Sequence, residues 1–186
     1  MTINLLLIKS TLLIYFISTI LYLISVISRK DMMGLYAKRV LAGGFLVHCL
    51  TIFARWWVTD ITPVASLHES LSFFALSLVG IYLLFDLRYR TAILGAFVCP
   101  IALVLMIGST VAPQQPVAPN PMLDSWWFPI HVTLAFLGHA VFAIAGIAGI
   151  MYLLQERMLK SKKFSGLFYR LPSLDVLDSI NYKCLS

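Results

Sequence analysis

The sequence predicts an all-α integral membrane protein, a bundle of about five transmembrane helices. Sixty per cent of its 186 residues are hydrophobic, 12% are charged and the mean hydropathy is +0.91, whereas a soluble domain carries about 25% charged residues. Its apolar runs are long enough to cross about 30 Å of hydrocarbon as helices. Helices are expected because a helix satisfies its own backbone polar groups in lipid.

Five apolar runs mark the expected spans, at residues 4–27, 40–58, 70–87, 91–111 and 130–154, and the links between them are 28–39, 59–69, 88–90 and 112–129. We expect residues 1–154 to form one transmembrane domain and residues 155–186 to form a basic cytoplasmic tail. The first run has no A-x-A-like cleavage site, and basic residues follow it rather than precede it. It is therefore expected to be a span and not a signal peptide.

The basic residues predict the orientation of the spans. Twelve of the 14 Lys and Arg fall in segments 28–39, 88–90 and 155–186, and none falls in 59–69 or 112–129. By the positive-inside rule the twelve are cytoplasmic, which places the amino terminus outside and the carboxy-terminal segment inside. Because topology accounts for the net charge of +6, we expect the lipid bilayer as the surroundings and no nucleic acid as a partner.

Several classes of chemistry are disfavoured by the motifs the chain lacks. The sequence contains no Walker motif, GxGxxG, nucleophile elbow or carboxylate dyad, so a nucleotide-driven pump or a hydrolase is not supported. The three cysteines, Cys49, Cys99 and Cys184, do not have the spacing of a redox motif or a metal site. No catalytic residue is predicted.

Four histidines are the candidates for ligand chemistry. His131 opens the last span, His139 lies about two turns deeper, His48 lies within the second span and His68 falls on the first outer link. Neutral imidazole binds haem iron and other transition metals, but each ring could instead be hydrogen-bonded inside the bundle or exposed at the interface. His131 is the strongest candidate because it follows an aromatic, proline-rich outer segment directly.

Two charged residues and two Trp pairs complete the candidate set. Arg55 near the end of the second span and Glu69 near the start of the third are expected to be close neighbours, because a charge near a span needs a partner. The pair could support a site, or Arg55 could pair with Glu69 or with Asp60 only to tie the link down. Trp126 and Trp127, like Trp56 and Trp57, suit either the aromatic belt of the membrane interface or packing on a ligand.

Three stretches of the chain resemble one known family. Residues 62–71 (TPVASLHESL) resemble a P-x-x-N-x-Y-E-S-L segment that opens a span, and residues 127–132 (WFPIHV) are similar to a W-x-x-x-H-V element. Residues 152–160 and 170–178 resemble a tail that contains Y-L-x-x-E and L-P-S-L-x-x-L-D. These motifs, in this order, are typical of the CcsA/ResC cytochrome c assembly proteins of system II, and the resemblance runs from about Arg55 to the end of the chain.

The resemblance implies a function and a ligand. His131 corresponds to the first outer haem-ligating histidine, so it is the expected axial ligand of haem iron, with Trp126 and Trp127 beside the haem. Members of this family transport haem b outward across a bacterial inner (plasma) membrane. Together with a CcsB/ResB-type membrane protein, they present it for attachment to apocytochrome c. They are transport and ligation factors rather than metabolic enzymes.

The chain departs from the family pattern in two ways. His68 stands where the family usually has Tyr, and Ala65 or Ser66 stands where it has Asn. Complete members continue past the tail into further spans, which carry a tryptophan-rich haem-handling motif and more histidines. The basic tail is therefore expected to continue into further spans in a complete protein. This short chain should hold haem weakly or not at all. Two alternatives remain open, a b-type cytochrome subunit and a non-catalytic membrane scaffold that regulates haem synthesis.

Overall fold

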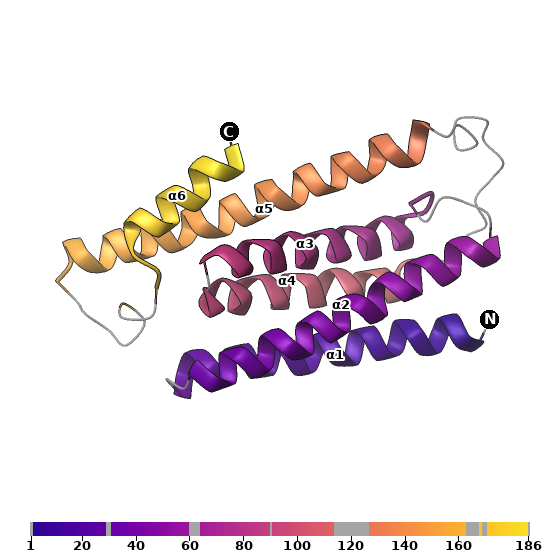
Figure 1. Ribbon diagram of the computed structural model, residues 1–186, viewed down its shortest axis with the longest axis horizontal. Coiled ribbons are helices and arrows are strands. Elements are labelled where there is room, and N and C mark those ends of the chain that lie inside the picture. Colours follow the sequence, from indigo (N-terminus) through magenta and orange to yellow (C-terminus); the bar gives the residue numbers. More distant parts are fainter. Residues whose placement is uncertain are drawn as a thin grey trace.

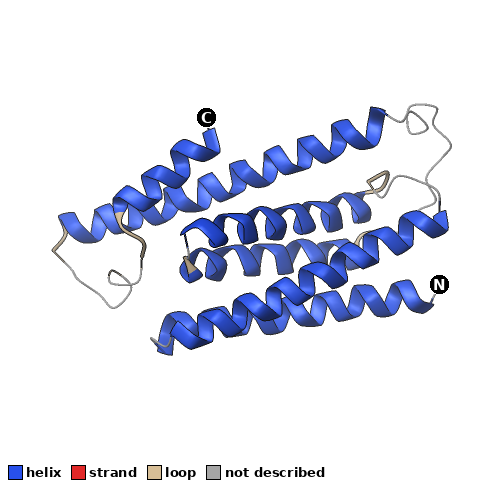
Figure 2. Ribbon diagram, in the orientation of Figure 1, coloured by secondary structure: helices blue, strands red, loops and turns tan. Residues whose placement is uncertain are grey.

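The computed structural model describes residues 2–28, 31–59, 64–89, 91–113, 127–162, 168 and 171–185, and all regular structure within these ranges is helical (Figures 1 and 2). The six helices are α1 (Thr2–Ser28), α2 (Asp31–Thr59), α3 (Leu67–Tyr89), α4 (Ala92–Val111), α5 (Trp127–Lys160) and α6 (Leu174–Leu185). The first five are long and apolar enough to span a membrane. The predicted fold class and number of spans are confirmed.

The helices extend further than the apolar runs that predicted them. Helix α2 begins at Asp31, so most of the predicted link 28–39 is helical, and α3 begins at Leu67 inside the predicted link 59–69. Helix α5 has 34 residues, about 51 Å at 1.5 Å per residue, and so exceeds the hydrocarbon thickness. Pro129 lies in its first turn, where a missing N–H costs no hydrogen bond. Hydropathy marks where the lipid ends, and a helix can continue past that boundary.

The five long helices run alternately up and down in layers. Helices α1 and α2 lie side by side, α3 and α4 form the middle of the bundle, α5 packs on α3, and α6 folds back on α5 (Figure 1). We call the end with the amino terminus of α1, the link from α2 to α3 and the start of α5 the Arg55 end. The opposite end holds the turn between α3 and α4 and the last turn of α5, and we call it the basic end.

A buried tyrosine pair joins three helices near the basic end. The hydroxyl groups of Tyr22 on α1 and Tyr82 on α3 are 2.8 Å apart, and both side chains are fully buried. Gly95 on α4 makes room for them, since a Cβ there would lie 2.5 Å from the Tyr82 hydroxyl oxygen and 2.6 Å from the Tyr22 ring. One hydroxyl donates to the other, and this hydrogen bond offsets the cost of burying the two polar groups.

Helix α6 lies within the segment predicted to be a basic tail. Its buried residues Leu177 and Ile180, with partly buried Cys184, recur at helical spacing and face α5, while Asp175 and Tyr182 are exposed. Ser173 immediately precedes the helix, and its carbonyl oxygen accepts a hydrogen bond from Val176 N–H at 3.0 Å. This pattern of spacing is that of an amphipathic helix, which the composition of the tail did not predict.

Two ion pairs join α2 to α3, one at each end of the bundle. At the basic end, Lys38 Nζ lies 2.6 Å from Asp86 Oδ2, and the Asp86 side chain is 5% exposed. At the Arg55 end, Arg55 pairs with Glu69. Because α2 and α3 are antiparallel, each pair joins the start of one helix to the end of the other.

Candidate functional site

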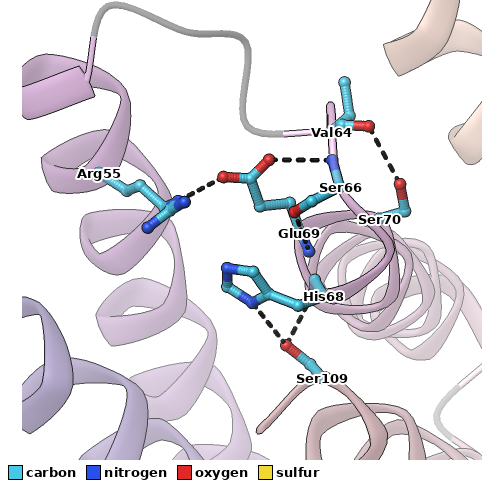
Figure 3. Close-up of polar contacts among 7 residues, drawn as sticks. All are labelled: Arg55, Val64, Ser66, His68, Glu69, Ser70 and Ser109. Carbon is cyan, nitrogen blue, oxygen red and sulfur yellow. Dashed lines mark hydrogen bonds and ion pairs between the residues drawn. The ribbon is translucent and has the colours of Figure 1, made fainter. Parts of the chain in front are cut away.

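Helix α3 begins in a capping box at the Arg55 end. The Ser66 backbone N–H donates to Glu69 Oε2 at 3.2 Å, and the Glu69 backbone N–H donates to Ser66 Oγ at 3.4 Å (Figure 3). This reciprocal S-x-x-E pattern satisfies backbone N–H groups that have no partner within the helix. It fixes where α3 starts and therefore where the next side chains, His68 and Glu69, point.

Glu69 also pairs with Arg55 across the gap between α2 and α3. Arg55 Nε donates to Glu69 Oε1 at 2.5 Å, with side-chain exposures of 31% for Arg55 and 5% for Glu69. The proximity predicted from the sequence is confirmed (Figure 3). The carboxylate thus uses one oxygen to cap α3 and the other to hold α2.

His68 is buried and not on an outer link, which corrects the sequence prediction. It is the second residue of α3 and is 4% exposed, because the helix starts three residues before the apolar run does. Ser109 Oγ on α4 donates to the His68 carbonyl oxygen at 2.8 Å and lies 3.5 Å from Nδ1. Figure 3 shows Nε2, the other ring nitrogen, pointing away from Ser109 toward the Arg55 side of the site.

His48 is fully buried in the bundle, and protein groups engage both of its ring nitrogens. The Tyr15 hydroxyl lies 3.1 Å from Nδ1 and Ser72 Oγ lies 2.9 Å from Nε2. Of the two readings that the sequence left open, the contacts favour a hydrogen-bonded residue inside the bundle. This histidine has no nitrogen left to bind iron without first losing a hydrogen bond.

His131 and His139 are both exposed along α5. His131 is the fifth residue of the helix and lies at the Arg55 end. His139 lies about 12 Å deeper along the axis, and its Nδ1 donates to the Ala135 carbonyl oxygen at 2.6 Å. The start of α5 is held against α3 by the Phe136 ring, whose centroid is 5.4 Å from that of Phe73 and 6.1 Å from that of Phe74.

The residues at the start of α5 fit one axial position of a haem. His131 presents an exposed imidazole, and Trp127, which is 63% exposed, adds an aromatic surface one turn earlier on the same helix face. Trp126 lies outside the described residues. Among the residues that the structure describes, no three His, Cys, Asp or Glu are grouped to hold a metal ion.

The fold and this site define a class of protein: a helical membrane bundle with a polar cluster and an exposed histidine at the same end. Comparison with known families makes the assignment specific. The profile described as "Cytochrome C assembly protein" matches residues 64–186. The chain belongs to this family.

Individual relatives support the same assignment. The chain is 34% identical over 149 residues to protein HemX of Brevibacillus brevis, covering 77% of this chain and 55% of that protein. It is 28% identical over 176 residues to protein HemX of Bacillus subtilis, covering 94% of this chain and 64% of that protein. It is also similar to the cytochrome c biogenesis protein CcsA of Guillardia theta, 28% identical over 166 residues, covering 77% of this chain and 55% of that protein. The chain thus spans roughly half to two thirds of the length of these relatives.

Proposed function

We propose that this chain is the membrane-embedded part of a haem-handling component of cytochrome c biogenesis. The observation that carries the proposal is the exposed His131 imidazole near the start of α5, in a chain of the cytochrome c assembly family. The substrate is haem b and the acceptor is apocytochrome c. A CcsB/ResB-type membrane protein is the proposed partner, and the bacterial plasma membrane is the proposed location.

The residues at the Arg55 end bind and orient the haem and carry out no covalent step. His131 supplies one axial nitrogen, and the helix fixes its backbone while its ring stays accessible. Trp127, which is exposed at the start of α5, supplies apolar surface to the macrocycle. The bound haem supplies the iron and the vinyl groups that are attached to the cytochrome. The Arg55–Glu69 pair and the Phe73–Phe136 contact support the site by fixing α3 and then α5.

A permanent b-type cytochrome is less well supported by the same contacts. Such a protein needs paired histidines deep in the bundle, and the deep candidates are His48 and His139. Both nitrogens of His48 are engaged by Tyr15 and Ser72, and His139 is exposed on α5. A scaffold that regulates haem synthesis remains the competing function, and a genetic experiment separates it from the proposal.

Deleting the gene is expected to abolish covalent haem attachment to c-type cytochromes while the apocytochromes are still made. The measurement is haem staining of membrane and secreted proteins after denaturing electrophoresis, with total haem measured in parallel. Restoring the gene should restore the stained bands. Normal c-type cytochromes together with altered total haem would overturn the proposal in favour of the regulatory scaffold.

We further propose that the Arg55 end faces the outside and the basic end faces the cytoplasm. In a variant without native cysteines, Pro113→Cys should react with a membrane-impermeant maleimide in intact cells, and Ser161→Cys should react only after the cells are opened. The native thiols are removed to avoid background, although burial raises the pKa of Cys184 and slows its reaction. Labelling of Ser161→Cys but not Pro113→Cys in intact cells would reverse the topology.

A further inference from the structure

A small cavity lies between α1, α2 and α3 at the Arg55 end. Its volume is about 20 Å³, and one water molecule needs about 10–15 Å³ measured in the same way. Most of its lining side chains are polar although it lies within a membrane bundle. They are Asn4, Thr51, Arg55, His68, Glu69 and Ser72.

Two buried polar atoms line this cavity without a hydrogen-bond partner among the described residues. They are His68 Nε2 and Asn4 Oδ1, from α3 and α1 respectively. Buried polar atoms are nearly always hydrogen-bonded, and a buried polar atom without a protein partner is often satisfied by an ordered water. The two atoms therefore point to a ligand that contacts both helices.

The contacts of His68 set which of its nitrogens carries the proton. The Ser109 hydroxyl donates its only hydrogen to the His68 carbonyl oxygen, so it cannot also donate to Nδ1. The 3.5 Å contact between Ser109 Oγ and Nδ1 is then satisfied by a proton on Nδ1. A neutral ring with its proton on Nδ1 presents a lone pair at Nε2, toward the Arg55 side of the site (Figure 3).

The occupant must therefore be small, neutral and a double donor. His68 Nε2 and Asn4 Oδ1 both accept, and the neighbouring charges of Arg55 and Glu69 already offset each other across 2.5 Å. A metal cation would lie beside the Arg55 guanidinium, which repels it. Water meets the size, the charge and the two-donor requirement at once.

We propose that this cavity binds one water molecule, which donates one hydrogen to His68 Nε2 and the other to Asn4 Oδ1. The water bridges α1 to α3 at the Arg55 end, whereas the direct hydrogen bond between these helices, Tyr22 to Tyr82, lies near the basic end. Ser72 lines the same cavity and is hydrogen-bonded to His48, which is bonded to Tyr15. The water site thus lies at the end of a hydrogen-bonded chain of side chains, Tyr15–His48–Ser72, that runs from the bundle interior to the Arg55 end.

Magic-angle-spinning NMR of the protein in lipid bilayers, with ¹⁵N-labelled histidine, tests the proposal. We expect the Nε2 resonance of His68 to be that of an unprotonated nitrogen and to show a cross-peak with water protons. His48 is the internal control, because protein hydroxyls engage both of its nitrogens, so its ring should show no such cross-peak. A His68→Gln variant assigns the resonance.

Asn4→Leu provides the matched perturbation, since it removes one acceptor and fills the cavity. The water cross-peak of His68 should be lost in this variant and retained in Leu5→Ile, a change at the exposed neighbouring side chain. A wild-type His68 with a proton on Nε2, or without the water cross-peak, would overturn the proposal, and this result does not require any variant to fold. A cross-peak that persists unchanged in Asn4→Leu would overturn the bridge to α1.

Discussion

Replacing His131 by alanine in the complete protein is expected to lower its haem affinity at least about tenfold and to stop most cytochrome c maturation. Changes to groups that only support a metal ligand already cost about 10–100-fold in metal affinity, and this change removes the ligand itself. The side chain is exposed near the start of α5, so its loss leaves no cavity in the core. The effect should therefore fall on haem binding and not on folding.

The measurement is the absorption spectrum of the purified variant, together with haem staining of c-type cytochromes in the producing cells. Added imidazole should restore part of both signals by filling the vacated axial position. His139→Ala is the matched control, since it removes an exposed imidazole from the same helix about 12 Å away and should leave the spectrum unchanged. A His131→Ala variant with the spectrum and maturation of the wild type would show that His131 is not an axial ligand.

Replacing Glu69 by alanine is expected to destabilise the bundle by about 3 kcal/mol. Breaking a buried ion pair costs about 3–5 kcal/mol, and the exposure of Arg55, 31%, lowers that figure because water screens the remaining charge. Loss of the capping box adds about 1 kcal/mol. Glu69→Gln should cost less, since the amide can still cap α3 while losing the charge.

Reversible unfolding in mixed detergent micelles, followed by tryptophan fluorescence, gives the free energy of unfolding for each variant. Ser66→Ala isolates the cap and should cost about 1 kcal/mol. Combining Arg55→Met with Glu69→Ala should cost less than the two single changes added together, because the double variant leaves no charge without its partner. Strictly additive costs would mean that the ion pair contributes nothing to stability.

The sequence predicted the spans and one ion pair because lipid imposes strong rules on composition. An apolar run of about 20 residues has few alternatives to a spanning helix. A charge near a span needs a partner, which favoured pairing Arg55 with Glu69 although Asp60 was a second candidate. The same rule applied to Asp86, a carboxylate within an apolar run, and would have pointed to its partnership with Lys38. That signal was present in the sequence and was missed.

Other parts of the site depend on where helices begin, which hydropathy does not report. His68 is buried because α3 starts at Leu67. The S-x-x-E pattern of Ser66 and Glu69 is a capping-box signature and predicts this helix start. No pattern in the sequence connects Asn4 to His68, because their proximity across the cavity arises only when α1 packs into the bundle.

The two ion pairs between α2 and α3 together set a length. Lys38 and Arg55 are seventeen positions apart on α2, and so are Glu69 and Asp86 on α3, which corresponds to about 26 Å along each helix. Because the spacings are equal, the helices can form both pairs in one register only, and sliding either by a turn would break both. The distance is a little less than the hydrocarbon thickness of about 30 Å, so the charges lie near the two edges of the hydrocarbon. The spacing of the two pairs therefore suits a bilayer of about this thickness, and a markedly thicker membrane would have to thin locally around the bundle to keep both pairs at its edges.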